Sequence, residues 1–175
     1  WVLFQDPRTQ LLRERVRSDV AFGLENRGVD PERIHEQIDT WADRLSVGHL
    51  LDRRIETLSR GERTLVALLG LLVTEPDVIV LDEPPLVLDS IDELRGETAL
   101  LVTEQNVRPF LTRVDRVLVL EAGEIGAAGS PRAVLEALQG ARVRLPFGTR
   151  VALERGVPTE QFHSEDDTVI EIADL

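Results

Sequence analysis

Hydrophobic residues follow two different spacings along this chain. Apolar positions recur at helical spacing in residues 16–24 and 31–45, and a third apolar helix is predicted over 59–73. The continuous apolar runs 78–81 and 99–102 are instead typical of strands that are covered on both faces of a parallel sheet. Because strands and helices alternate, the sequence predicts an α/β domain.

Turn and cap residues mark where several of these elements begin and end. Asp30 is placed as the N-cap of the helix over 31–45, with a proline at its first position. The short apolar run 1–4 predicts the end of a buried strand. Residues 116–120 predict another strand, followed by a hairpin turn, and Ser130 precedes a proline that starts a further helix.

Polar side chains follow the two apolar strands. Asp82 and Glu83 come directly after 78–81, and Thr-Glu-Gln-Asn at 103–106 follows 99–102. In an open parallel sheet, ligands bind beyond the carboxyl ends of the strands. An Asp-Glu pair there suits nucleotide hydrolysis, because Asp82 can hold Mg²⁺ through a water and Glu83 can take a proton from the attacking water. The alternative is a buried strand capped by two solvated acids.

A short motif opens the helix predicted over 59–73. It reads Leu-Ser-Arg-Gly-Glu at 58–62, so a hydroxyl and a glycine lie at the helix start. The amides and the positive dipole end of a helix N-terminus attract anions. Taken alone, the motif is more simply interpreted as an ordinary serine-capped helix.

The two motifs together resemble the ATP-binding-cassette (ABC) ATPase family. Ser59 lies 23 residues before Asp82, and a helix, a proline-containing loop and a strand separate them in the order typical of that family. LSRGE takes the place of the family's leucine-serine-glycine-glycine-glutamine signature. The resemblance covers roughly residues 1–138 and implies a P-loop NTPase-like fold with a parallel sheet flanked by helices.

The resemblance also implies how the chain is organised. Residues 1–140 are expected to form a partial ABC ATPase domain, with a helical signature subdomain at about 14–72. Residues 141–167 are expected to be a C-terminal extension or linker. The segment 168–175 resembles the first strand of a second cassette, and a frayed acidic tail is the alternative.

Site residues follow from matching positions in the family. Gln5 resembles the Q-loop glutamine, and Gln105 falls on the position of the switch histidine, although glutamine cannot carry a proton at neutral pH. The roles implied are catalytic for Glu83 and Gln105, nucleotide-binding for Ser59, Arg60, Gly61, Glu62 and Asp89, and Mg²⁺-binding for Gln5 and Asp82.

Three departures from the family pattern stand out. Arg60 replaces a signature glycine, and the interval from Asp89 to Gln105 is short. The chain also has no GxxxxGK[ST] loop and no lysine that would serve in one. Because the chain contains no methionine, Trp1 is not expected to be a native start. We therefore expect an N-terminal truncation that leaves out Walker A, with ATPase activity in the full-length parent and little in this fragment alone.

Two further segments, 18–26 and 144–149, resemble energy-coupling-factor ATPases. The implied function is an ATP-binding subunit of a membrane importer, which couples ATP hydrolysis to uptake of a vitamin or metal ion. ATP and Mg²⁺ are the implied cofactors. The implied partners are a transmembrane component and a second ABC ATPase domain in a homodimer, heterodimer or tandem chain. The expected location is cytoplasmic, peripheral on the inner face of the cell membrane.

Three alternatives remain open. A degenerate, non-hydrolysing cassette would act as an assembly or regulatory partner. A branched-chain amino-acid-type importer ATPase is suggested by the string Glu-Gln-Asn at 104–106, which is similar to one in some amino-acid importer cassettes. A soluble cassette ATPase of DNA repair or translation is the third.

Composition limits the partners, metal sites and membrane segments that the chain allows. Acidic residues number 32 against 20 basic ones, for a net charge of −12, which argues against a nucleic-acid partner because binding phosphates requires clustered positive charge. The absence of cysteine excludes disulfides and thiolate metal sites. The longest apolar run, 65–73, is far shorter than the roughly 20 residues that span a bilayer.

Overall fold

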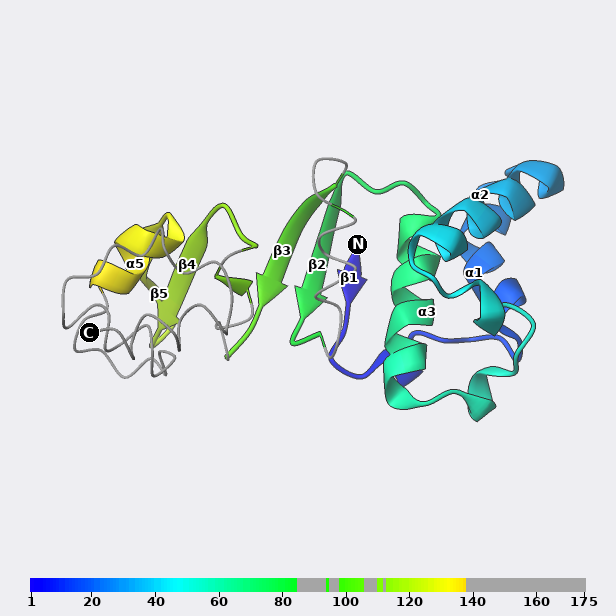
Figure 1. Cartoon of the computed structure of the whole chain (residues 1–175), viewed down its shortest axis with the longest axis horizontal. Coiled ribbons are helices and arrows are strands. Elements are labelled where there is room, and N and C mark those ends of the chain that lie inside the picture. The colour runs from blue at the N-terminus through cyan, green and yellow to red at the C-terminus, as the bar shows by residue number, and fades with distance from the viewer. Residues whose placement is uncertain (85–93, 95–97, 106–109, 112, 138–175) are drawn as a thin grey trace, which may run out of the picture. The chain divides into compact units, whose positions relative to one another are not determined.

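The computed structural model describes residues 1–84, 94, 98–105, 110–111 and 113–137. They belong to two compact units, Trp1–Gln105 and Asn106–Leu175, which are described separately (Figure 1). Three features expected from the sequence lie outside the described residues: Asp89, the extension at 141–167 and the strand at 168–175.

The first unit contains a three-stranded parallel sheet in the order β1-β2-β3. Its strands are β1 (Val2–Leu3), β2 (Val78–Asp82) and β3 (Ala99–Thr103). Side chains alternate between the two faces, so that Ile79 is fully buried while its neighbour Val78 is 49% exposed. Because the strands are parallel, their carboxyl ends lie at one edge of the sheet (Figure 1).

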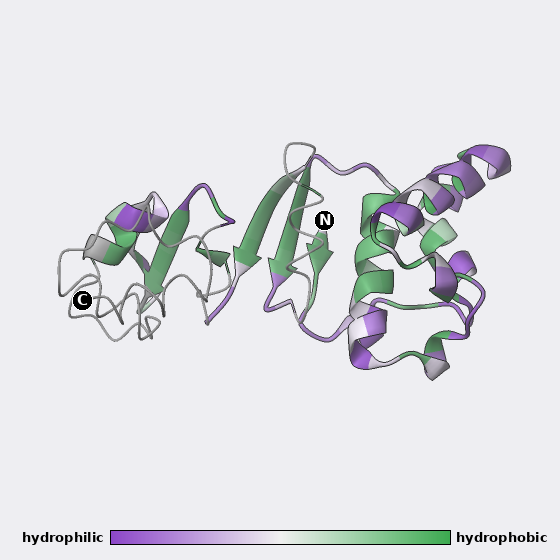
Figure 2. Ribbon diagram, in the orientation of Figure 1, coloured by the Kyte–Doolittle hydropathy of each residue, from purple (hydrophilic) through white to green (hydrophobic). Residues whose placement is uncertain are grey.

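The described part of this unit also contains three helices of ten to fourteen residues. They are α1 (Val16–Glu25), α2 (Pro31–Arg44) and α3 (Arg60–Leu72), and each packs against the other two, while α3 also packs against β1. Figure 2 shows that α3 and the strands are largely hydrophobic, whereas the outer turns of α2 are hydrophilic. The buried apolar side chains of the three helices are Val16, Val20, Ala21, Leu24, Ile34, Ile38, Trp41, Ala42, Val66, Ala67, Leu68, Leu69 and Leu72.

The connection between α2 and α3 is tied to the chain just before α1. It contains two short 3₁₀ helices, η2 (Gly48–Leu50) and η3 (Ile55–Thr57). Backbone hydrogen bonds join Val16 N to Arg53 O at 3.1 Å and Ile55 N to Glu14 O at 2.9 Å. Another short 3₁₀ helix, η1 (Pro7–Thr9), follows β1. The two backbone hydrogen bonds at Arg53 and Ile55 fix the connection that leads into α3.

The second unit contains a hairpin and a helix. Strands β4 (Val117–Glu121) and β5 (Glu124–Gly129) pair antiparallel, and α5 (Pro131–Ala137) packs on both of them. Ala122 and Gly123 make the turn at φ values of 52° and 84°. Two successive positive φ angles are what a two-residue hairpin turn of type I′ requires.

The elements predicted from the hydrophobic pattern within the described residues are confirmed, with ends that shift by one or two residues. β2 extends one residue further than predicted and includes Asp82, and β3 likewise includes Thr103. Asp30 caps α2 as expected, since its carboxylate accepts the Glu32 N–H at 2.9 Å. In the described part of the chain, no helix is long and apolar enough to cross a membrane.

Candidate functional site

The candidate site lies where β2 and β3 end. Asp82 is the last residue of β2 and pairs in register with Thr103, the last residue of β3. Glu83 follows in a left-handed conformation with φ of 44°, and its N–H donates to Thr103 O at 3.0 Å. A non-glycine residue in this region is uncommon and marks a local constraint. The chain therefore turns sharply at Glu83.

Two glutamines hold the Glu83 carboxylate. Gln5 Nε2 donates to Glu83 Oε2 at 2.6 Å, and Gln105 Nε2 donates to Glu83 Oε1 at 2.6 Å. The three residues follow β1, β2 and β3 respectively, so the parallel sheet places them side by side. Both oxygens of Glu83 are thus engaged by amide donors, one from each neighbouring strand end. We call Gln5, Glu83 and Gln105 the amide clamp.

Asp82 is held by a different contact. The Thr103 hydroxyl donates to Asp82 Oδ1 at 2.7 Å. Asp82 Oδ2 and Gln5 Oε1 make no hydrogen bond with the residues that the structure describes. Carboxylate and amide oxygens are ligands that Mg²⁺ accepts, either directly or through its waters. The donor set at this edge of the sheet therefore fits a magnesium ion.

The loop that carries Gln5 is itself folded by polar contacts. Gln10 reaches back to β1, where its Oε1 accepts the Phe4 N–H at 2.9 Å and its Nε2 donates to Val2 O at 2.7 Å. Asp6 caps η1, and hydrogen bonds from Arg8 lower the pKa of the Asp6 carboxyl to about 2. Gln5 therefore sits on a loop anchored on both sides rather than on a loose end.

The LSRGE motif forms a reciprocal capping box at the start of α3. Ser59 Oγ accepts the Glu62 N–H at 3.2 Å, and Glu62 Oε2 accepts the Ser59 N–H at 2.6 Å. This backbone hydrogen bond from Ser59 is the main cause that lowers the pKa of the Glu62 carboxyl. Arg53 Nη1 adds an ion pair to Glu62 Oε1 at 2.7 Å. The Ser59 hydroxyl still has its own proton to donate to a ligand.

Arg60 and Gly61 complete the motif in the first turn of α3. Arg60 is exposed, and its guanidinium makes no hydrogen bond or ion pair with another described residue. Its positive charge helps, as a minor cause, to lower the pKa of the Asp6 carboxyl on the Gln5 loop. In Figure 1 the N-terminal end of α3 lies on the same side of the first unit as the carboxyl ends of the strands.

Removing the Ser59 hydroxyl tests the strength of this cap. We expect Ser59→Ala to lower the free energy of unfolding by about 1 kcal/mol, because one N-terminal amide of α3 loses its acceptor. Urea denaturation followed by circular dichroism measures the change. Ser18→Ala is the matched control, since Ser18 lies exposed within α1 and makes no capping bond. An equal loss in both variants would contradict the capping role.

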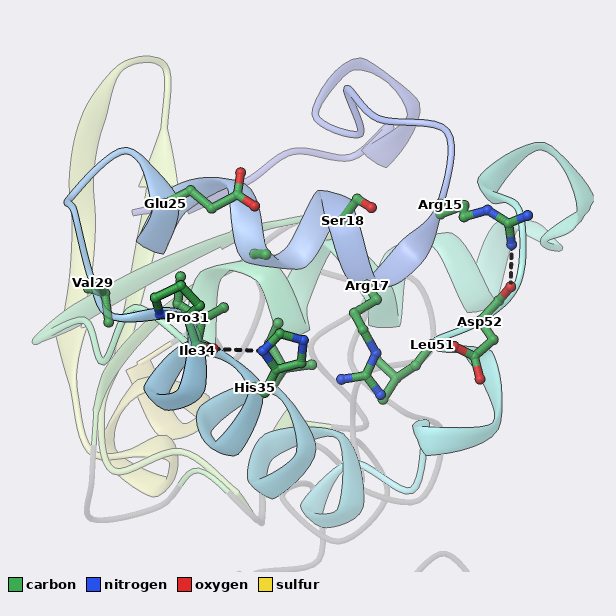
Figure 3. A pocket seen from close by; sticks show the side chains of 12 residues that line it. Arg15, Arg17, Ser18, Glu25, Val29, Pro31, Ile34, His35, Leu51 and Asp52 are labelled. Atoms are coloured by element: carbon green, nitrogen blue, oxygen red, sulfur yellow. Dashed lines mark hydrogen bonds between the residues drawn. The ribbon is translucent and has the colours of Figure 1, made fainter.

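A pocket of about 480 Å³ lies between α1 and α2 (Figure 3). Ala21, Ile34 and Ile38 contribute apolar lining, and Arg15 and Arg17 lie at one end. Arg15 Nη1 donates to Asp52 O at 3.1 Å, and Arg17 Nη1 pairs with Asp39 at 2.9 Å. The pocket therefore combines an apolar floor with cations that are already held in place.

Asp19, on α1, ties this helical layer to the chain that follows the Gln5 loop. Its Oδ1 accepts the N–H groups of Leu12 and Arg13 at 2.6 and 2.7 Å. Burial is the main cause that raises the pKa of the Asp19 carboxyl, and the two backbone hydrogen bonds oppose the rise. The segment after the Gln5 loop and α1 are thus joined by partly buried polar contacts.

The structure brings together four of the residues singled out from the sequence: Gln5, Asp82, Glu83 and Gln105. It places the 58–62 motif on a separate element, at the start of α3. Sequence reasoning missed Thr103, although a hydroxyl one residue beyond the apolar run 99–102 was a readable signal. It also missed Arg53, whose contact with Glu62 joins residues nine positions apart through a non-helical connection.

Comparison with known proteins gives a match to the ABC transporter family over residues 2–85. The chain is 37% identical over 155 residues to a putative ABC transporter ATP-binding protein of Halobacterium salinarum, and the match covers 83% of this chain and 67% of that protein. The chain belongs to the family of ABC transporter ATP-binding proteins. The matched range 2–85 of this cassette includes Gln5, the 58–62 motif and the Asp82-Glu83 pair, but not Gln105.

Two further relatives are informative about this cassette. The energy-coupling factor transporter ATP-binding protein EcfA1 of Halalkalibacterium halodurans is 32% identical over 174 residues, covering 91% of this chain and 63% of the relative. The structure of CbiO1 from Clostridium perfringens, part of the ABC transporter complex CbiONQ, matches with a TM-score of 0.69 and 30% identity, covering 86% of this chain and 65% of that one. The predicted ABC ATPase fold is confirmed. The chain spans less than two thirds of these two relatives' lengths.

Proposed function

We propose that this chain is part of the ATP-hydrolysing subunit of an energy-coupling-factor-like importer. The amide clamp carries the proposal, because it sets a carboxylate at the carboxyl edge of a parallel sheet, beside a second carboxylate that suits Mg²⁺. In nucleotide hydrolysis the attacking water needs a group that orients it and accepts its proton. Glu83 is placed to do this.

The amide clamp has consequences for how Glu83 works. Each of its oxygens accepts one amide hydrogen bond, which orients the carboxylate and leaves a second lone pair on each oxygen to accept a water proton. Gln105 cannot hold a proton itself at neutral pH, because an amide does not titrate there. Its role is to donate a hydrogen bond, to Glu83 at rest and to a phosphate oxygen or water when nucleotide is bound.

ATP and Mg²⁺ are the cofactors that this site fits. Asp82 would hold the metal through a water, and Gln5 would contribute its amide oxygen. The metal would neutralise the charge that develops on the phosphate oxygens. Asp82 and Glu83 lie next to each other in the sequence, and the two carboxylates divide the chemistry, since Asp82 serves the metal and Glu83 serves the water.

A second cassette would contact this chain at the start of α3. The Ser59 hydroxyl and the first-turn amides of α3 would donate to the phosphates of a nucleotide held by the partner. Arg60 would add a positive charge there. The capping box leaves the Ser59 proton available for this purpose while it keeps the helix end rigid.

A transmembrane component is the other proposed partner. The pocket between α1 and α2 offers an apolar surface edged by arginines, which suits a short amphipathic segment of a membrane protein. The name of EcfA1 and the description of CbiO1 as part of a transporter complex support association with a transporter, and we propose that this association places the protein on the cytoplasmic face of a membrane. Uptake of a vitamin or metal ion is the transport that we propose, on the resemblance carried by segments 18–26 and 144–149.

An ATPase assay tests the proposed function. A longer protein that joins this chain to an intact phosphate-binding loop is expected to hydrolyse ATP only when Mg²⁺ is present. The 175-residue chain, which contains no GxxxxGK[ST] sequence, is expected to show negligible turnover. Brisk turnover by the 175-residue chain that Glu83→Gln abolishes would contradict this expectation. A full-length protein that binds ATP and never hydrolyses it would favour a non-hydrolysing cassette.

A further inference from the structure

We propose that Thr103 is a positioning residue that sets the directions of both Asp82 and Glu83. The inference rests on the proposed ATPase function, because that function gives the two carboxylates their roles. Neither the motifs nor the relatives' names assign Thr103 a role. The residue contacts both acids from the neighbouring strand, and it lies directly across from Asp82 in the register of the sheet.

The Thr103 hydroxyl contacts the side chain of Asp82 and the backbone of Glu83. It donates to Asp82 Oδ1 at 2.7 Å and accepts the Glu83 N–H at 3.3 Å. The Glu83 N–H also donates to Thr103 O at 3.0 Å, so its hydrogen bond is shared between the carbonyl and the hydroxyl. A hydroxyl suits this position because it is a donor and an acceptor at once, whereas an aliphatic side chain is neither.

For Asp82, the contact holds the orientation of the carboxylate. Oδ1 is engaged by Thr103, and Oδ2 makes no hydrogen bond with a described residue. The hydrogen bond therefore favours one orientation of the carboxylate, in which Oδ2 and the second lone pair of Oδ1 can accept from a metal-bound water. Without the hydroxyl, the Asp82 side chain would sample other orientations, and it would lose the positioning that makes binding of the metal favourable.

For Glu83, the contact supports the sharp turn after β2. A left-handed backbone at a non-glycine residue persists only when its surroundings hold it. Thr103 supplies that support through its carbonyl and its hydroxyl, and the turn directs the Glu83 side chain between Gln5 and Gln105. Thr103 thus acts on the chemistry through the two acids and does not itself contact a reacting atom.

Two substitutions separate this role from simple support of the strand. Thr103→Val keeps the β-branched shape that suits a strand and removes the hydroxyl. Thr103→Ser keeps the hydroxyl and removes the methyl group. A role in strand packing alone predicts that serine is the more damaging change, whereas the positioning role predicts that valine is.

The first measurement uses Mg²⁺-dependent ATPase activity of the full-length protein. For Thr103→Val we expect the Mg²⁺ concentration at half-maximal rate to rise, and kcat to fall, each by about tenfold, as loss of a hydrogen bond to a charged group predicts. Thr103→Ser is expected to stay within about twofold of wild type in both, since its only loss is a methyl group. Values for Thr103→Val that equal those of wild type would overturn the proposal.

The second measurement does not depend on activity. In the 175-residue chain, the ¹³C chemical shift of the Asp82 carboxyl carbon at neutral pH is expected to move in Thr103→Val and to stay at the wild-type value in Thr103→Ser. An unchanged shift in Thr103→Val would overturn the Asp82 contact. If the full-length wild type hydrolyses no ATP, the proposed function fails, and the carboxyl shift still decides whether Thr103 holds Asp82.

Discussion

Replacing Glu83 with glutamine in the full-length protein is expected to reduce ATP hydrolysis by at least about a hundredfold, because a positioned general base contributes roughly 10²–10⁴-fold to such reactions. Glutamine has nearly the same shape as glutamate but cannot accept the proton of the attacking water. ATP binding should remain close to wild type, since the substitution removes no predicted phosphate contact. A radioactive or colorimetric phosphate assay measures the rate, and equilibrium binding of a fluorescent ATP analogue measures the affinity.

Glu36→Gln is the matched control for this experiment. Glu36 is exposed on α2 and belongs to no proposed site, so the same change of charge there should leave the rate unaffected. A Glu83→Gln protein that retains turnover within tenfold of wild type would place the general base elsewhere. Loss of nucleotide binding in the same variant would indicate a damaged fold instead.

The second large effect concerns stability. Ile79→Ala in β2 is expected to lower the free energy of unfolding by about 2–5 kcal/mol, because it leaves a cavity beneath the strand that carries the two acids. Ile79 is fully buried and lies in the central strand of the three-stranded sheet. Urea denaturation of the 175-residue chain, followed by far-ultraviolet circular dichroism, measures the change.

Val78→Ala serves as the control on the same strand. Val78 precedes Ile79 and faces the other side of the sheet, where it is 49% exposed in this chain. We expect its substitution to cost less than about 1 kcal/mol, the range of strand propensity differences. Equal losses at both positions would mean that the two faces of the sheet are equally buried in solution, contrary to the structure.

The structure gives a physical account of two charged residues in the 58–62 motif, Glu62 and Arg60. Glu62 brings a negative charge to the start of α3, and Arg53 neutralises it at 2.7 Å while the capping box uses its other oxygen. Arg60 then remains as the exposed positive charge of that helix turn. We therefore expect the first turn of α3 to keep its attraction for phosphate despite the acidic residue in the motif.

Local patterns in the sequence were enough to predict the secondary structure and the order of the residues with candidate chemistry. Apolar periodicity separates helices from strands, and the acids after β2 are visible as the first polar residues beyond a buried run. Asp30, a proline and the 58–62 motif likewise mark helix starts, because capping depends on side chains within three residues of the amide they serve. Such signals are local, so no fold is needed to detect them.

Which of these residues contact one another depends on the fold. Gln5 and Glu83 are 78 residues apart in the chain and 2.6 Å apart at their hydrogen-bonded atoms, a contact that depends on the pairing of β1 with β2. The pairing of β2 with β3 likewise sets Thr103 against Asp82. Register between parallel strands is a long-range property, because it depends on how the hydrophobic faces of strands that are distant in the chain pack together. A single sequence therefore predicts the acids, and the fold decides that two amides and one hydroxyl hold them.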